Sequence, residues 1–180
     1  MKIKINNMMI ECRQGDITSQ PDIEVIVNSA NAHLAPGGGV AGAIHRKAGL
    51  QLYEECKKYA PISTGQAVIT RGYNLPNKYV IHTLGPVYTR EKNPAKKLAL
   101  CYKNCLRLAE KNSLESIAFP AISAGIFGYP IEEAARVAIK AVLEEVPKLK
   151  ELKLICFVLY DDKSYKIFQE VLKEVIQNKS

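Results

Sequence analysis

The sequence predicts an α/β domain built in three layers, and two observations carry this prediction. Apolar, β-branched segments alternate with longer amphipathic segments along the chain, which is typical of α/β proteins. In addition, runs such as "VIV" (25–27) and "LICFVL" (154–159) are almost continuously apolar, as expected for strands covered on both faces. The 180 residues suit one domain with a substantial core, so we treat 1–180 as a single domain.

The expected elements follow one another without a linker or repeat. The start, "MKIKINNMMIEC", reads as a strand pair that turns at Asn6-Asn7. Five further strands are expected, over 24–28, 66–72, 78–83, 115–120 and 152–160. Helices are expected over 39–48, 49–59, 94–110, 131–145 and 162–176. Asn93 would cap the third helix, with Pro94 in its first turn.

Charge and hydropathy narrow the possible partners. The net charge of +7 favours anionic partners, but only weakly, because Lys and Glu are interspersed. Nucleic-acid binding is kept as a weak alternative, since no pattern of alternating basic and aromatic residues supports it. No apolar run approaches the ~20 residues of a membrane span, and the start lacks the apolar core of a signal peptide. We therefore expect an intracellular, cytoplasmic protein that does not associate with membranes.

The five cysteines form no recognisable metal or disulfide pattern. There is no C-x-x-C motif, and the helical pair Cys101 and Cys105 has no further ligands nearby. We expect all five to be buried and reduced, and we expect neither a metal site nor a cofactor. The five are Cys12, Cys56, Cys101, Cys105 and Cys156.

The stretch "PGGGVAGAIH" (36–45) spells the G-x-G-x-x-G fingerprint of dinucleotide-binding folds through Gly37, Gly39 and Gly42. Its context does not fit that fold. Eight residues separate the preceding strand from Gly37, and the downstream carboxylates lie in a helical pattern rather than at a strand end. We therefore interpret the register as accidental, with the consecutive Gly37–Gly39 mattering more than Gly42.

The consecutive glycines suit a phosphate cradle. They let the backbone approach a ligand closely, and a helix begins immediately after them, so free N–H groups point at the same place. The alternative is a flexible loop that merely enters a helix. Upstream, the amides of Asn28 and Asn31 would either read sugar hydroxyls or tie the loop down.

A second loop of mostly small residues, "PAISAGIFGYP" (120–130), also precedes a helix. Its aromatic Phe127 would pack either on a ligand or into the core. Two such loops at neighbouring strand ends predict a pyrophosphate clamped from both sides. The loop residues in question are Ser123, Ala124, Gly125, Ile126 and Phe127.

Taken together, these segments resemble the macro domain family, whose members bind ADP-ribose. The matching motifs, in family order and spacing, are "QGDIT" (14–18), "VIVNSAN" (25–31), "GGGVAGAIH" (37–45), "GYNLPNKYVIHTLGP" (72–86) and "SIAFPAISAGIFGYP" (116–130). The resemblance covers nearly the whole chain. It implies a mixed sheet between helix layers, and a site for ADP-ribose and its conjugates, including ADP-ribosylated proteins.

The resemblance also implies a role for individual residues. Asp16 would bind the adenine amino group beside Ile17, although by itself Asp16 could equally cap a turn, and Tyr160 would stack on adenine. The diphosphate and the distal ribose would lie between the two glycine loops. Asn31 would contact the distal ribose from one side, and Phe127 would lie against the same sugar from the other. These two loops contribute Gly37, Gly38, Gly39 and Val40, and Ser123, Ala124, Gly125, Ile126 and Phe127.

Many family members hydrolyse bonds at the distal ribose of ADP-ribose conjugates. The resemblance therefore favours a hydrolase, with Asn31 in the mechanism and Phe127 positioning the sugar. One branch of the family carries an aspartate where this chain has Ala41, so the identity of the base is open and a non-catalytic reader is the rival. His45 shares a helix face with Ala41 and is a weak catalytic candidate, and a packed or surface-capping histidine is the favoured interpretation. His82, within a strand, is expected to be a satisfied core histidine.

Overall fold

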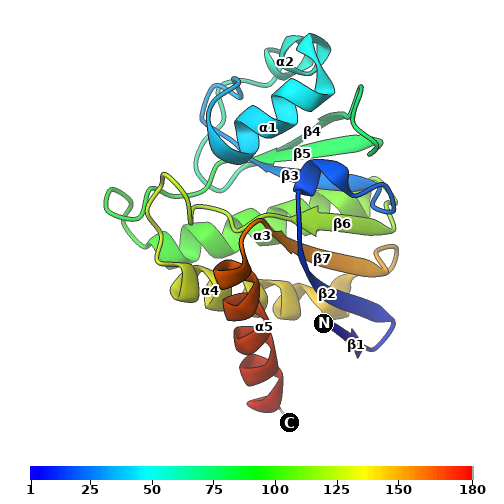
Figure 1. Ribbon diagram of the computed structural model, residues 1–180, viewed down its shortest axis with the longest axis vertical. Coiled ribbons are helices and arrows are strands. Elements are labelled where there is room, and N and C mark those ends of the chain that lie inside the picture. The colour runs from blue at the N-terminus through cyan, green and yellow to red at the C-terminus, as the bar shows by residue number, and fades with distance from the viewer. Residues whose placement is uncertain (180) are drawn as a thin grey trace.

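The computed structural model describes residues 1–179 and shows a seven-stranded mixed sheet in the order β1-β2-β7-β6-β3-β5-β4 (Figure 1). The five inner strands run parallel, and β1 and β4 pair antiparallel at the two edges. The strands are β1 (Lys2–Ile5), β2 (Met8–Gln14), β3 (Val25–Ser29), β4 (Ala67–Arg71), β5 (Tyr79–Thr83), β6 (Ser116–Phe119) and β7 (Leu154–Leu159).

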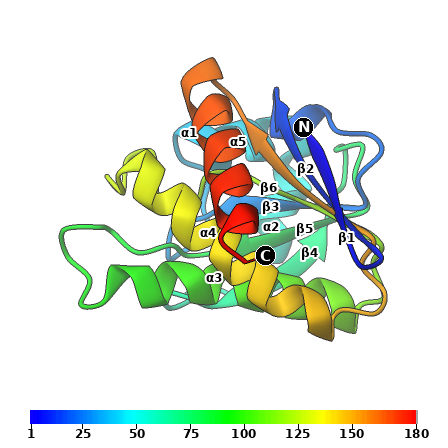
Figure 2. The same ribbon diagram turned by 90° about the horizontal axis from the view of Figure 1, so that it is seen from below.

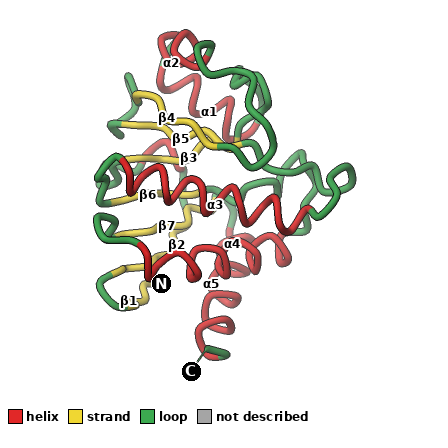
Figure 3. The backbone as a smooth tube through the Cα atoms, turned by 180° about the vertical axis from the view of Figure 1, so that it is seen from behind, coloured by secondary structure: helices red, strands yellow, loops and turns green. Residues whose placement is uncertain are grey.

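Helices cover both faces of the sheet, which gives the three-layer α/β/α architecture (Figures 2 and 3). On one face, α3 (Pro94–Lys111), α4 (Ile131–Glu145) and α5 (Asp162–Gln177) bury their apolar stripes in the larger core cluster. On the other, α1 (Gly39–Ala48) and α2 (Leu50–Cys56) pack on Ile26, Val80 and Ala118 in a smaller cluster. Short 3-10 turns, η1 (Ile17–Ser19) and η2 (Val146–Lys148), complete the chain.

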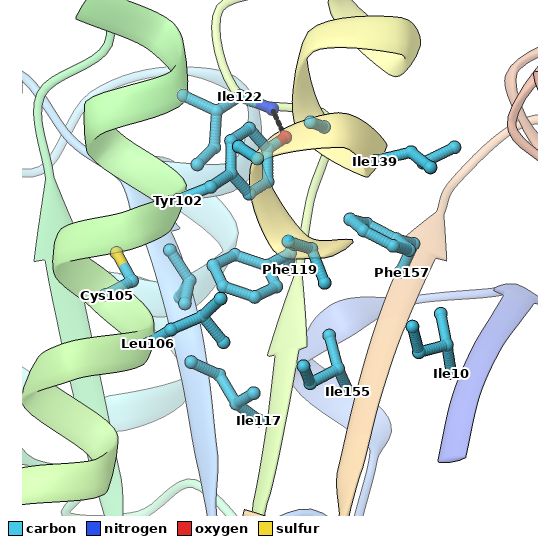
Figure 4. Packing of buried hydrophobic residues seen from close by; sticks show 14 of the residues in the cluster. Ile10, Tyr102, Cys105, Leu106, Ile117, Phe119, Ile122, Ile139, Ile155 and Phe157 are labelled. Carbon is cyan, nitrogen blue, oxygen red and sulfur yellow. Dashed lines mark hydrogen bonds between the residues drawn. The ribbon is translucent and has the colours of Figure 1, made fainter. Parts of the chain in front are cut away.

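The larger core holds the second glycine loop in place. The Phe119 and Phe157 rings lie 6.0 Å apart on adjacent strands, and Tyr102 of α3 packs 4.9 Å from Phe119 (Figure 4). The Tyr102 hydroxyl donates to the Pro120 carbonyl at 3.2 Å and accepts from the Ile122 amide, also at 3.2 Å. A buried tyrosine therefore fixes the start of the 120–130 loop, because its hydroxyl needs partners once it is removed from water.

The expected elements are confirmed with end shifts of one or two residues, apart from the second helix, whose regular turns stop at Cys56 rather than residue 59. The expected cap of α3 is wrong in one respect. Asn93 adopts a left-handed conformation (φ 54°) before Pro94, and its side chain makes no capping hydrogen bond. An N-cap residue normally has an extended backbone, which lets its side chain reach the first-turn amides, and the left-handed backbone of Asn93 departs from that geometry.

All five cysteines are buried and free, as expected. Within residues 1–179, no helix combines the length and apolar character needed to cross a bilayer.

Candidate ADP-ribose site

A pocket of about 680 Å³ lies at the carboxyl ends of β2, β6 and β7, beside α1. This is the edge of an open α/β sheet at which ligands bind in general. Four segments that are distant in sequence meet there because their parallel strands end together. The lining residues are Gly15, Asp16, Ile17, Gly39, Val40, Ala43, Arg46, Pro120, Ala121, Ala124, Gly125, Ile131, Val158, Leu159, Tyr160, Asp161, Lys163 and Ser164.

The first turn of α1 is open toward this pocket. Gly38 occupies the N-cap position without a side-chain cap, and the first turn carries no acidic residue. Gly39 has φ +56°, and a Cβ placed on it would meet no atom within 4 Å. Unsatisfied N–H groups and the positive end of the helix dipole are therefore presented to a ligand, as an anion site requires.

The helix that follows the second loop, α4, does not offer the free N-terminus that an anion site would use. The first turn of α4 contains Glu132 and Glu133, whose carboxylates already complement the helix dipole. The backbone N–H groups of the second loop can therefore bind an anion, but the N-terminus of α4 does not add a second uncompensated helix dipole.

The two glycine loops face each other, because β3 and β6 are neighbouring parallel strands. A Cβ placed on Gly38 would lie 3.8 Å from Cδ1 of Ile126, whose side chain is 88% exposed. Phe127 is half-buried, and its carbonyl accepts the Tyr88 amide at 2.9 Å. The two loops thus lie on opposite sides of the end of the pocket that Gly39 and Gly125 line, and we call the space between them the channel.

Gly42 is more important than the sequence suggested. A Cβ on Gly42 would lie 2.2 Å from the Gly37 carbonyl oxygen, a distance that no side chain can occupy. The glycine loop therefore packs directly onto the backbone of α1. The expectation that Gly37–Gly39 matter more than Gly42 did not foresee this contact, which makes close loop–helix packing the reason for a glycine at position 42.

At the other end of the pocket, Asp16 and Tyr160 come together. Oδ1 of Asp16 accepts the amide and the hydroxyl of Thr18 at 2.8 and 2.7 Å. The Thr18 hydroxyl bond is the main reason why the pKa of Asp16 lies below its usual value, so the group is a carboxylate at neutral pH. Oδ2 accepts no hydrogen bond from residues 1–179, which leaves it free for a donor on a ligand. Tyr160 is 84% exposed and presents an open ring face at the rim.

Similarity to known proteins agrees with this geometry. The macro domain family model matches residues 27–138. This chain belongs to the macro domain family. It is 44% identical over 168 residues to a macro domain-containing protein of Chlorobaculum tepidum, with 93% of this chain and 97% of that protein covered.

Two further relatives carry names that describe a ligand or an activity. The ADP-ribose glycohydrolase MACROD2 of Xenopus laevis is 44% identical over 96% of this chain, which spans 43% of that longer protein. The Oceanobacillus iheyensis macrodomain with ADP has a TM-score of 0.95 at 39% identity, covering 99% of this chain and 97% of that one.

In this macro domain, Asn31 lies beside the glycine loop rather than in the pocket. Its amide closes the 31–35 loop in both directions, donating to the Ala35 carbonyl at 2.8 Å and accepting the Ala35 amide at 3.0 Å. A Cβ on Gly37 would lie 3.5 Å from its Nδ2. Asn31 therefore supports the glycine loop from the side of Gly37.

Two other predicted residues point away from the channel. Asn28 is 1% exposed, and its Nδ2 lies 3.1 Å from Nδ1 of His82 in the interior. Ser123 is 3% exposed as a residue, its side chain packs against Gly85, and its carbonyl accepts the Tyr129 amide at 2.9 Å from a backbone held at φ +67°. Both shape the site from below.

His45 also lies in the interior of the macro domain. It is 6% exposed, its ring packs edge-on to Tyr53 with centroids 6.1 Å apart, and neither ring nitrogen has a partner within residues 1–179. Burial lowers its pKa, so the ring is neutral at pH 7. Ala41, one turn earlier, is buried too, and neither residue lines the pocket.

Arg46 and Lys163 line the pocket and were missed in the sequence. Arg46 lies one turn of α1 beyond Gly42, and Lys163 lies in the first turn of α5. Helical spacing from the glycine loop could have indicated Arg46. Lys163 depends on the position of α5 relative to α1, which is set by the strand order.

Proposed function

We propose that this macro domain binds ADP-ribose and hydrolyses ADP-ribose conjugates at the distal ribose. The observation that carries the proposal is the open N-terminus of α1, which faces the Ile126 loop across a channel and adjoins a pocket of about 680 Å³. The uncapped N-terminus of α1 suits a negatively charged pyrophosphate, and a pocket of this volume has room for a nucleoside. The names of its relatives, an ADP-ribose glycohydrolase and a macrodomain with ADP, support the same ligand class.

The adenosine half would occupy the pocket. The free Oδ2 of Asp16 suits the exocyclic amino group of adenine, a donor, with the Ile17 backbone beside it. The exposed Tyr160 ring would stack on the base, which fits an aromatic side chain left open at a pocket rim. In this pose the diphosphate reaches Gly38–Val40 and the Ser123–Phe127 backbone, and the distal ribose lies near Asn31.

The chemistry asked of the site is hydrolysis. In the reaction of a glycosyl ester, water attacks the anomeric carbon, the bond to the carboxylate oxygen breaks, and the carboxylate leaves while the water loses its proton to solvent or to the product. For O-acetyl-ADP-ribose the water attacks the acyl carbon instead, and for ADP-ribose 1″-phosphate inorganic phosphate is released. The site would hold the sugar and orient the water.

Among the described residues that line the pocket, no carboxylate stands at the proposed distal end. Asp16 and Asp161 both lie at the adenosine end, where each caps a turn or helix, and Ala41 occupies the buried face of α1. We therefore assign water positioning to the substrate's own phosphate together with Asn31. The same observation favours the second candidate, a reader that binds ADP-ribose without turnover.

The deciding experiment measures free ADP-ribose after incubation with mono-ADP-ribosylated protein, with O-acetyl-ADP-ribose and with ADP-ribose 1″-phosphate. Calorimetry on ADP-ribose runs in parallel. Release above the buffer rate supports the hydrolase. Binding without release from any of the three identifies a reader, and absence of binding removes both.

Asn31→Ala tests the role of the loop in turnover. The variant loses both hydrogen bonds to Ala35 and the amide beside Gly37, so we expect turnover to be abolished. Full activity in this variant would remove Asn31 from the mechanism. Its thermal unfolding serves as the control for a merely destabilised fold.

The basic net charge motivates one more candidate, the binding of RNA or poly(ADP-ribose). Affinity for such polyanions falls steeply with salt concentration because counterions are released on binding. A salt series with an RNA oligonucleotide and with ADP-ribose would separate a polyanion surface from the channel.

A further inference from the structure

A second concave surface lies at the β4 edge of the sheet. This β4 groove has a volume of about 520 Å³ and takes its floor from Ala67 and Val68. One wall is the side of α3 that carries Leu108, and the other is the loop that carries Tyr59 and Ile62. Tyr59 is 43% exposed, so its ring offers apolar surface to the groove.

The strand at the floor of the groove has an open edge. Within residues 1–179, β5 is the sole hydrogen-bonded neighbour of β4. The Gly72 amide donates to the Lys78 carbonyl at 2.9 Å, which places even-numbered residues toward β5 in the alternating antiparallel ladder. Ala67 and Ile69 therefore direct their N–H and C=O groups outward. Arg71 shares that side, and its amide is already used by Oε1 of Glu55 at 3.1 Å.

The groove is basic as well as apolar. Arg107 and Lys111 line it, and none of the described residues that line it is acidic. Arg107 shares its charge with Glu145, whose Oε1 lies 2.8 Å from Nη2. Lys111 is exposed and makes no ion pair within residues 1–179. Lys111 therefore supplies the unpaired positive charge that would complement an acidic segment.

The β4 groove also begins next to the distal end of the channel. The amide of Ile62, which lines the groove, donates to the carbonyl of Ala32 at 2.9 Å. Ala32 follows Asn31 directly in the chain. In an ADP-ribosylated protein the polypeptide is attached at the distal ribose, so the proposed pose beside Asn31 would bring it out near the Ile62 end of the groove.

We propose that the β4 groove docks the polypeptide of an ADP-ribosylated substrate, as an extended acidic segment that pairs with the open edge of β4. This inference rests on the proposed binding of ADP-ribose in the channel. The backbone groups of Ala67 and Ile69 pair with the segment, in the manner of β-strand addition to a sheet edge. Its acidic side chains meet Lys111 and Arg107, and its apolar ones meet Tyr59 and Leu108.

Two variants test the groove by different means. Ala67→Pro removes one outward N–H at the start of an edge strand, a place where proline is tolerated. Lys111→Glu reverses the charge at the rim. Lys140→Glu makes the same charge change on the exposed face of α4, outside the groove, and is the matched control.

Calorimetry on each protein would use a Glu-rich peptide mono-ADP-ribosylated on a glutamate, the unmodified peptide, free ADP-ribose and a single-stranded RNA. We expect both groove variants to weaken binding of the modified peptide about tenfold and to leave free ADP-ribose within about twofold. The control variant should match the parent protein for every ligand.

The outcomes separate the groove from the channel. Equal loss for peptide and free ADP-ribose, or no loss for either, overturns the docking proposal. The proposal is also overturned if the RNA binds the parent protein and binds Lys111→Glu more weakly, while neither peptide binds the parent. If the parent protein fails to bind free ADP-ribose, the proposed function is wrong. In that case the groove is still supported if the parent binds the unmodified peptide and both groove variants bind it more weakly.

Discussion

At the scale of single residues, Gly42 shows how a backbone contact can outweigh local propensity. Alanine is about 1 kcal/mol better than glycine inside a helix, so Gly42→Ala in α1 would normally stabilise the protein. Here the new Cβ would lie 2.2 Å from the Gly37 carbonyl oxygen, and the glycine loop would have to move.

We expect Gly42→Ala to lower the free energy of unfolding by about 1–3 kcal/mol, as overpacking does, and to weaken ADP-ribose binding at least about tenfold. Urea unfolding and calorimetry measure the two effects. Gly125→Ala is the stability control, because its Cβ would meet nothing within 4 Å. A Gly42→Ala protein more stable than the parent would contradict the steric argument.

His82 makes stability depend on pH. It is 0% exposed, its Nε2 lies 2.9 Å from the Thr70 hydroxyl, and burial lowers its pKa to about 3. Above the unfolded-state pKa of about 6.5, both states hold the ring neutral and stability is unaffected. As pH falls from about 6.5 toward 3, the unfolded state takes up the proton first, so the folded state loses stability.

We expect this loss to be on the order of 4 kcal/mol between pH 7 and pH 3, since each pKa unit corresponds to about 1.4 kcal/mol. Buried His45, whose pKa is also lowered, adds to it. Urea unfolding across this pH range measures the effect. In His82→Gln the dependence should become shallower, and an unchanged slope in that variant would assign the acid sensitivity to other groups.

At the scale of elements, the turn η1 depends on a side chain beneath it. Gln20 is buried, and its Nε2 donates to the Asp16 carbonyl at 2.8 Å. Its Oε1 accepts from Nη1 of Arg13 in β2 at 2.9 Å. Gln20 is therefore a positioning residue that holds the Asp16 loop against the strand from which it emerges.

Gln20→Ala should weaken ADP-ribose binding about tenfold and bring the affinity ratio of ADP-ribose to inosine diphosphate ribose closer to one. The reason is that a displaced Asp16 no longer selects the adenine amino group, which hypoxanthine lacks. Calorimetry with both ligands gives the ratio. Gln169→Ala, which removes the 2.9 Å bond to the Tyr165 hydroxyl on α5, is the control. A weaker affinity at an unchanged ratio would mean that Gln20 serves stability alone.

At the scale of the whole molecule, the site unites segments from most of the chain. Residues 15–17, 39–46, 120–125 and 158–164 meet because β2, β6 and β7 end at one edge of the sheet and α1 packs beside it. A ligand that contacts all four segments binds the folded state alone, so it should raise the stability of the entire domain.

At a free concentration of 100 times its Kd, ADP-ribose should stabilise the fold by about 2.7 kcal/mol. For a domain of this size the expected rise in Tm is about 5–10 °C. Differential scanning calorimetry measures it, with ribose 5-phosphate as a control that lacks the nucleoside and the pyrophosphate. A Tm that does not respond at saturating ADP-ribose would contradict a site built from all four segments.

The sequence alone determined the elements, because hydrophobic periodicity and turn residues act locally. It predicted the seven strands, the five helices and the phosphate cradle of Gly37–Gly39, and the motif set indicated the family. The burial of Asn28 and Ser123 could not be predicted, because the sequence pattern of a polar residue beside a glycine loop is the same whether its side chain faces a ligand or the interior.

Only the tertiary structure decided which of these residues share a surface. The strand order brings Lys163 of α5 to the same pocket as α1, buries His45 and Asn28, and leaves β4 at an edge of the sheet. Gly42 belongs here too, because its requirement arises from a carbonyl that the loop brings within contact distance. The physical reason is that close approach and burial depend on segments far apart in the chain, and local propensity does not report them.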